Sequence, residues 1–274
     1  MPRIDHAFLD CAIYLYPNEK AARSGISYGG SGFLVAVPYE LDIDGVRRSH
    51  VYAVTNSHVV RESRSPVIRL NKLEGQTEVL PLTYKDWIDD WDEDDLAVCM
   101  LDDTIMNRFR WFAPTPSSFL RDDLLNGIVG VGTDVITIAR FIAHDGKQEN
   151  LPVALFGNIS MLNWEAIRRP DRENLKQESF LVQSKAFPGT SGSPVFLAPL
   201  EPGMVNMLVG IVWGYSYLRA EIRRKNPDKP IRESSMYVND NTGMMLVIPA
   251  WKLQRFLDRS DLVMQRKKIE QEAM

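Results

Sequence analysis

The sequence has little of several features that mark specialised classes of protein. Only two of its 274 residues are cysteines, Cys11 and Cys99, and each lies inside an apolar run without a Cys-x-x-Cys spacing. We therefore expect two buried free thiols, which excludes a fold built on a disulfide framework. The N-terminus has no basic segment followed by an apolar stretch of signal-peptide length, and no apolar run approaches the roughly 18 residues of a membrane span. A cytoplasmic protein with no membrane partner is expected.

The chain also lacks a strong excess of charge of either sign. It carries 36 acidic and 32 basic residues, a formal net charge of −4, which is too small an excess to argue for a nucleic-acid partner or a membrane surface. Seven acidic residues gather in segment 86–95, but without the spacing of a calcium loop, so a solvated loop is favoured over a metal site. The basic segment near Arg223 lacks interleaved aromatic residues and is interpreted as another solvated loop. We expect no metal and no cofactor.

Short apolar runs separated by turn residues dominate the chain up to about residue 250, which predicts an all-β body. The runs are too short and too evenly spaced for alternating strands and helices. The Pro- and Ser-rich segment 113–118 divides them into two similar sets, so we expect two small barrels, residues 1–118 and 119–250. The expected strands are 9–16, 32–37, 51–55, 67–70, 96–101, 135–139, 153–156, 180–182, 194–197, 207–212 and 245–248.

The pattern changes after Pro249. Apolar residues then recur at helical spacing, so segment 251–274 is predicted to be a C-terminal helix with a tail. The tail, residues 264–274, is rich in Lys, Gln and Glu and is expected to fray or protrude. Two polar stretches, 163–178 and 219–243, are interpreted as surface insertions.

Segment 187–196 carries the sharpest chemical signal. It reads Phe-Pro-Gly-Thr-Ser-Gly-Ser-Pro-Val-Phe, small turn-forming residues between two apolar strands. A tight bend of this kind can expose the Ser191 hydroxyl as a nucleophile and direct the N–H groups of Gly189 and Ser191 at one point, the two features that acyl transfer needs. The alternative interpretation is an ordinary Gly/Ser/Pro turn.

A serine nucleophile needs a base, and the chain has only four histidines. His58 follows an apolar strand that ends at Thr-Asn-Ser, residues suited to capping a short helical turn, so its imidazole is fixed at a strand end. His6, His50 and His144 are interpreted as solvated surface residues.

A buried carboxylate that orients the imidazole is the third requirement. Asp95 precedes the segment Leu-Ala-Val-Cys-Met-Leu, a predicted strand that is apolar on both faces, so its side chain stands at the entrance to the core. Asp94 is adjacent and is the alternative. We predict Asp95.

In their order along the chain, His58, Asp95 and Ser191 with their flanking residues resemble the trypsin-like, chymotrypsin-fold serine peptidases. Gly-Gly-Ser-Gly-Phe-Leu-Val at 29–35 and Gly-Ile-Val-Trp-Gly at 210–214 resemble the strands before the histidine and after the serine. Further matches, to the bacterial high-temperature-requirement branch, are at 131–135 and 243–250. An α/β-hydrolase is excluded, because it needs the order Ser, Asp, His and a glycine where this chain has Ser193.

The resemblance implies two six-stranded antiparallel β-barrels with a C-terminal helix, and a serine endopeptidase that cleaves protein or peptide substrates. One departure concerns activation. Secreted trypsins have an aspartate directly before the nucleophile, which pairs with a newly cut N-terminus, whereas this chain has Thr190. The site is therefore expected to be preformed or to be ordered by a regulatory protein partner. The alternative is a catalytically silent module that binds a partner through its cleft.

The resemblance also implies a substrate-binding region. It places the floor of the primary pocket at Lys185 and a substrate-pairing edge strand at Val212, Trp213, Gly214 and Tyr215. A lysine at that floor suggests an acidic residue before the cut, although most surface lysines are merely solvated.

Overall fold

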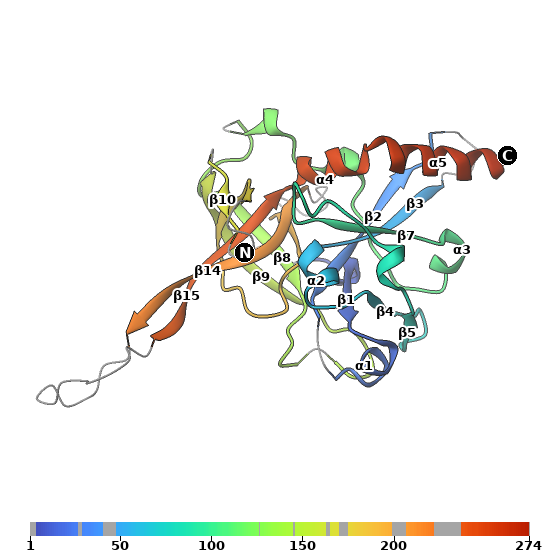
Figure 1. Ribbon diagram of the computed structural model, residues 1–274, viewed down its shortest axis with the longest axis horizontal. Helices are drawn as coiled ribbons and strands as arrows, with labels where there is room; N and C mark the ends of the chain where they lie inside the picture. Colours follow the sequence, from blue (N-terminus) through green and yellow to red (C-terminus); the bar gives the residue numbers. More distant parts are fainter. Residues whose placement is uncertain are drawn as a thin grey trace, which may run out of the picture.

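The computed structural model describes residues 4–26, 29–40, 48–125, 127–144, 146–162, 165–169, 175–198, 207–221 and 237–273. The chain forms two β-rich halves, with two helices running from the C-terminal half across the N-terminal half (Figure 1). The predicted all-β double-barrel architecture with a C-terminal helix is confirmed.

The N-terminal half is a seven-stranded antiparallel sheet with the strand order β5-β4-β1-β2-β3-β7-β6. Among the described residues the two edge strands do not pair with each other, so this half is a half-barrel rather than the closed six-stranded barrel expected. Its elements are β1 (Ala12–Tyr16), α1 (Glu19–Ser24), β2 (Ser31–Pro38), β3 (Ser49–Thr55), α2 (Ser57–Arg61), β4 (Val67–Asn71), β5 (Thr77–Leu80), β6 (Ile88–Asp89), β7 (Ala97–Leu101) and α3 (Asp103–Met106). Short 3-10 helices lie at His6–Cys11, Tyr84–Asp86, Pro116–Ser118 and Asp122–Leu124.

The C-terminal half is a closed six-stranded barrel with the order β12-β15-β14-β13-β8-β9, as predicted. Its strands are β8 (Asp134–Ala139), β9 (Val153–Leu162), β12 (Phe180–Gln183), β13 (Pro194–Leu197), β14 (Leu208–Glu221) and β15 (Tyr237–Pro249). A short hairpin of β10 (Ile167–Arg168) and β11 (Lys176–Gln177) lies between β9 and β12 in the chain.

Alternation along the N-terminal strands buries both faces of the sheet. On β2, Phe33 and Val35 join a core that also contains the apolar side chains of the C-terminal barrel. Leu34 points to the other face and joins a second core inside the N-terminal half. The halves therefore share one continuous apolar core, which fixes the sheet that carries the histidine against the barrel that carries the serine.

Each of the eleven predicted strands corresponds to an observed one, but β9, β14 and β15 are much longer than expected. β14 and β15 continue past the barrel as a two-stranded ribbon that projects from the body of the molecule (Figure 1). Tyr217, Leu218, Tyr237 and Val238 on this ribbon are exposed. The predicted surface insertion 219–243 is thus strand in its described parts, and the basic segment near Arg223 lies outside the described residues.

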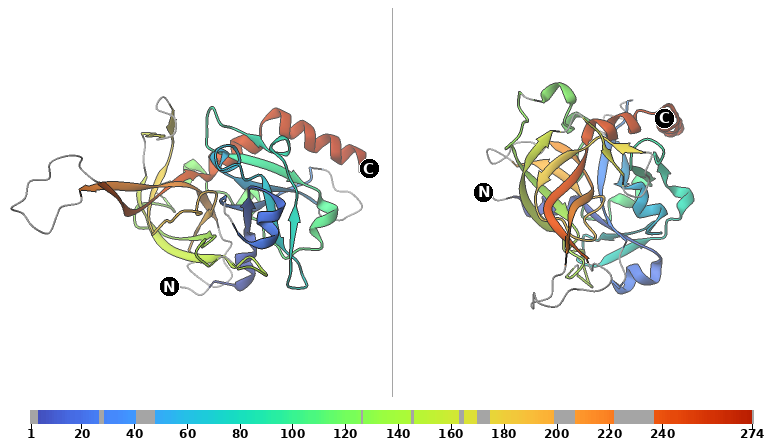
Figure 2. Two further views of the ribbon diagram at one scale, coloured as in Figure 1. Left: turned by 60° about the horizontal axis from the view of Figure 1, so that its bottom comes forward. Right: turned by 60° about the vertical axis from the view of Figure 1, so that its left-hand side comes forward.

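The C-terminal helix is confirmed, but the prediction that its tail frays is wrong. After α4 (Ala250–Leu257), α5 (Ser260–Glu272) lies along the N-terminal half (Figure 2). Glu270 is buried and its Oε1 lies 2.9 Å from Nε2 of His50. Arg266 donates to the hydroxyl of Tyr52 over 3.2 Å. Polar contacts with His50 and Tyr52 on β3 therefore hold the tail as a helix, and the composition of the tail alone does not reveal them.

The same contacts overturn the expectation for His50, which is buried and stacked on Tyr39. His6 and His144 are exposed, as expected. Cys11 and Cys99 are buried free thiols, also as expected, and burial raises the pKa of Cys99 to about 12. No helix in the described part of the chain is long and apolar enough to cross a membrane.

Candidate active site

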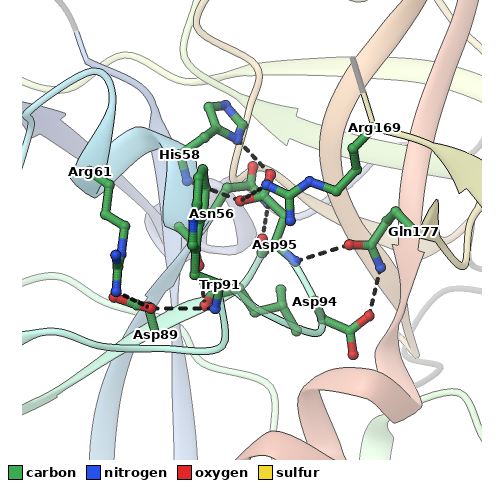
Figure 3. Close-up of polar contacts among 11 residues, drawn as sticks. Asn56, His58, Arg61, Asp89, Trp91, Asp94, Asp95, Arg169 and Gln177 are labelled. Carbon is green, nitrogen blue, oxygen red and sulfur yellow. Dashed lines mark hydrogen bonds and ion pairs between the residues drawn. The ribbon is translucent and has the colours of Figure 1, made fainter. Parts of the chain in front are cut away.

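His58 and Asp95 meet at the end of two paired strands. β3 and β7 run antiparallel, so α2, which follows β3, lies beside the residues that precede β7. The carboxylate of Asp95 contacts His58 twice: Oδ2 lies 2.6 Å from the ring Nδ1, and Oδ1 accepts from the backbone N–H over 2.9 Å (Figure 3). This contact fits a proton on Nδ1, which makes Nε2 the basic nitrogen. The Asp95 side chain is 2% exposed and that of His58 21% exposed.

The bend before His58 is held to the bend before β7 by two further hydrogen bonds. Asn56 donates from its side chain to the Asp95 carbonyl over 2.8 Å, and Ser57 donates to the Leu96 carbonyl over 2.6 Å. Both donors are fully buried. Asn56 is the residue before α2, but its side chain does not cap that helix as the sequence suggested. It joins the bend before His58 to the bend before β7 instead.

Asp94 has different partners. Its Oδ1 accepts from the side-chain amide of Gln177 over 2.7 Å, and its Oδ2 lies 3.5 Å from Nζ of Lys252. Of the two adjacent carboxylates, the one in contact with His58 is that of Asp95.

Ser191 lies in the bend between β12 and β13. Hydrogen bonds within the bend engage the N–H groups of Thr190 and Ser193, and the N–H of Gly192 donates to the carbonyl of Val212 on β14 over 2.8 Å. In the described part of the chain the N–H groups of Gly189 and Ser191 have no acceptor. These are the two amides that the sequence predicts as the anion site.

The serine bend is tied to the N-terminal half through β2 and the glycines before it. Ser31 donates its N–H to the Ser191 carbonyl over 2.9 Å and its hydroxyl to the Gly189 carbonyl over 2.7 Å. A methyl group on Gly30 would lie 2.8 Å from Val59, the neighbour of His58, and 3.2 Å from the Ser191 carbonyl. Among the described residues no hydrogen bond joins the Ser191 hydroxyl to His58.

Gly192 shows why the bend needs glycine next to the serine. Its φ is +85°, in the left-handed region. A methyl group there would overlap the Ser31 carbonyl and the hydroxyl of Thr55, which themselves form a 2.7 Å hydrogen bond. Ser31 and Thr55 thus hold the serine bend in place, a role that the sequence motifs did not reveal.

The predicted substrate-binding residues divide into two groups. Val212 and Trp213 are buried: both backbone groups of Val212 bond the serine bend, and the indole N–H of Trp213 donates to Ser179 over 2.9 Å. Gly214 and Tyr215 are partly exposed on β14. Lys185 is exposed, and its role at a pocket floor stays a prediction.

The predicted surface insertion 163–178 contributes two buried residues to the site, so that interpretation is wrong for Arg169 and Gln177. Arg169 and Gln177 are both at most 1% exposed. Arg169 extends toward the Asp95 carboxylate, and Gln177 accepts from the Asp95 backbone N–H over 2.9 Å (Figure 3). Residues 163–164 and 170–174 lie outside the described chain.

The acidic stretch 86–95 is only partly a solvated loop. Trp87 and Trp91 within it are buried, and Asp89 forms two hydrogen bonds with Arg61. Across the described residues, no group of three or more His, Cys, Asp or Glu side chains is arranged to hold a metal ion.

Comparison with known proteins adds a family and a fold. The model of the trypsin-like peptidase domain matches residues 30–199. The apo protease domain of MamO from Magnetospirillum magneticum aligns with a TM-score of 0.52 and 16% identity, over 92% of this chain and 98% of that one. Rv3671c from M. tuberculosis H37Rv, in an inactive form with serine replaced by alanine, aligns with a TM-score of 0.47 and 13% identity, over 90% and 85%. No curated protein sequence matches the chain.

Proposed function

This chain belongs to the trypsin-like peptidase family, and from that premise we propose that it is a serine endopeptidase that hydrolyses peptide bonds in protein or peptide substrates. One observation carries the proposal. The buried carboxylate of Asp95 lies 2.6 Å from Nδ1 of His58, on the half of the molecule that β2 joins to the Ser191 bend.

The reaction follows from the protonation states that this contact favours. Ser191 Oγ attacks the peptide carbonyl carbon while Nε2 of His58 takes the hydroxyl proton. Asp95 keeps the ring oriented and stabilises the imidazolium that forms. The N–H groups of Gly189 and Ser191 bind the oxyanion, each worth about 2.7–4 kcal/mol. His58 then returns the proton to the leaving amine. In the second half of the reaction, water attacks the acyl carbon while His58 takes a proton from it, and His58 returns that proton to Ser191 Oγ as the acid product leaves.

The proposal includes a regulated site. His58 and Asp95 are in contact, whereas Ser191 and His58 are not hydrogen-bonded to each other in the described chain. We therefore expect substrate, or a regulatory protein partner, to bring the serine hydroxyl to the imidazole. Such a step replaces the N-terminal ion pair of secreted trypsins, which Thr190 does not allow.

The same missing hydrogen bond favours a second candidate, a silent module that binds a protein through its cleft. A fluorophosphonate probe separates the two, because it labels only a serine that an adjacent base activates. We expect stoichiometric labelling of the native protein, with candidate partner proteins added if the free protein reacts slowly. Ser191→Ala removes the labelling and lowers peptide hydrolysis by about 10⁶-fold.

Ser193→Ala is the matched control. Ser193 is two residues away in the same bend, fully buried, and its hydroxyl has no hydrogen-bond partner among the described residues. Replacing it should leave labelling and hydrolysis within a few-fold of the native values. Hydrolysis by Ser191→Ala at the native rate would exclude the peptidase proposal.

The role of Lys185 is testable with a peptide library. If this exposed lysine contacts the substrate residue before the cut, the library shows a preference for Asp or Glu there, and Lys185→Ala removes the preference. Loss of the charge should reduce kcat/KM for acidic peptides by about 10-fold. A flat profile in the native enzyme would end this assignment.

A further inference from the structure

Arg169 is a cation buried beside the catalytic carboxylate. Its side chain is 0% exposed, and one terminal nitrogen, Nη2, lies 3.9 Å from Oδ1 of Asp95. The guanidinium carbon lies 4.6 Å from the centre of the Trp91 ring, and the backbone N–H donates to the Leu175 carbonyl. The contacts with Trp91 and Asp95, both in the acidic stretch 86–95, fix the direction of the guanidinium.

Gln177 reaches the same place from the partner strand of the hairpin. Its side-chain oxygen accepts from the backbone N–H of Asp95 over 2.9 Å, and its nitrogen donates to Asp94 over 2.7 Å. One amide therefore holds both the backbone of the catalytic acid and the neighbouring carboxylate. This arrangement fixes where the backbone of Asp95 enters the core.

The hairpin and the triad acid come from different halves of the molecule. His58 and Asp95 lie at strand ends of the N-terminal sheet, whereas β10 and β11 belong to the C-terminal half, which also carries Ser191. The hairpin is therefore a contact between the half that supplies the base and the half that supplies the nucleophile. Figure 3 shows the side chains of Arg169 and Gln177 both extending toward Asp95 from the right of the view.

We propose that Arg169 is a positioning residue of the triad: from the C-terminal half its buried positive charge faces the Asp95 carboxylate and holds it turned so that Oδ2 faces His58. The proposal rests on the proposed peptidase function. Burying a lone carboxylate is costly, and a nearby guanidinium reduces that cost. Oδ1 faces Arg169 and also accepts the His58 backbone N–H, which leaves Oδ2 to the imidazole.

The cation also acts on His58 through the carboxylate. Asp95 favours the imidazolium, and the positive charge on its far side opposes that effect. Other charged groups on the stretch 86–95 and their partners are Asp94 with Lys252 on α4, which also contacts Glu178, Asp90 with Arg259, and Asp89 with Arg61 on α2. None of these pairs includes Arg169, so its replacement leaves both members of each pair unchanged.

The test measures the titration of His58 by NMR in the Ser191→Ala background, where turnover is not needed. The His58 ring signal is assigned by its loss in His58→Ala. Arg169→Met keeps the length and removes the charge, so the His58 midpoint should rise by about 0.5–1 pH unit. Arg169→Lys keeps the charge and should restore the midpoint to within a few tenths of a unit.

Arg169→Gln is the second variant if the methionine variant does not fold, because it keeps a polar group at the buried site. An unchanged His58 midpoint in a folded Arg169→Met or Arg169→Gln protein would overturn the proposal. So would a midpoint in Arg169→Lys as high as in Arg169→Met.

The activity arm separates this proposal from the peptidase function. In the protein with Ser191 intact, only neutral His58 accepts the serine proton. The acid limb of the kcat/KM profile should therefore move to higher pH in Arg169→Met and stay close to its native position in Arg169→Lys. If no variant or native protein hydrolyses peptides while the NMR midpoints shift as expected, the peptidase function fails and the coupling of Arg169 to His58 stands.

Discussion

The two sides of the candidate site differ in how much of their geometry exists before a ligand binds. On the N-terminal side, Asp95 contacts His58 through both carboxylate oxygens, and buried side chains join the bends that carry them. On the C-terminal side, Gly189 and Ser191 present backbone N–H groups that have no acceptor among the described residues. The polar groups of the predicted acid and base are therefore paired with each other, whereas the two predicted anion-site amides have no acceptor in the described chain.

The difference follows from what each group must do. A buried carboxylate must be neutralised and hydrogen-bonded at all times, or it destabilises the fold. An anion site gains its effect by meeting charge that develops only in the transition state, so its donors must not be occupied beforehand.

The largest expected effect comes from breaking the preassembled side. Asp95→Asn should lower kcat by about 10⁴-fold, because the amide no longer holds the catalytic tautomer of His58. Asp94→Asn is the matched control one residue away. It removes the charge that faces Lys252 but can still bond Gln177, so its loss should stay below about 10-fold. Steady-state kinetics on one peptide measures both. Equal losses in the two variants would remove the distinction between the carboxylates.

The second effect comes from distorting the open side. Gly192→Ala places a methyl group against the Ser31 carbonyl and the Thr55 hydroxyl at a φ of +85°. The serine bend must shift, and a displacement of about 1 Å costs about 10²-fold in rate. Gly130→Ala, which meets nothing within 4 Å, is the control and should retain activity. Native activity in Gly192→Ala would show that the position of the bend is not critical.

The smallest effect concerns the outer face of the preassembled half, where α5 packs on β3. Burial lowers the pKa of His50 from its ordinary value of 6.5, and the contact with Glu270 only partly offsets this. The unfolded chain therefore takes up the proton first, and the free energy of unfolding falls as the pH drops below 6.5. Above 6.5 the residue is neutral in both states and has no such effect.

His50→Gln removes this titration and keeps a hydrogen-bond donor for Glu270. Denaturant unfolding at pH 7 and pH 5 should show a larger loss of stability in the native protein than in His50→Gln. Parallel losses in the two proteins would assign the pH dependence to other groups.

The strands and the triad positions could be predicted from the sequence because their signals are local. Turn residues bound each apolar run, and the residues flanking His58, Asp95 and Ser191 are short motifs. The geometry brings the first two into contact and puts the third on a bend tied to β2. Their catalytic roles remain predictions.

The buried polar residues could not be predicted, since a polar side chain is buried only where a distant segment supplies its partner. Arg169, Gln177 and Glu270 all occur in polar, charged stretches that are typical of solvated surface. Each is buried against residues more than 70 positions away in the sequence. Similarly, the length of β14 and β15 is set by their pairing with each other beyond the barrel. The spacing of apolar residues in either strand does not reveal that pairing.

β14 runs without interruption from the serine bend to the projecting ribbon. At about 3.3 Å per residue, its 14 residues extend about 45 Å. One part of the strand receives and donates the hydrogen bonds that hold Gly192 and Ser193, and the other part is an arm of the projecting ribbon. The projecting ribbon and the bend of Ser191 are therefore joined by a single hydrogen-bonded strand, whose pairing with β15 is irregular between Val212 and Tyr217.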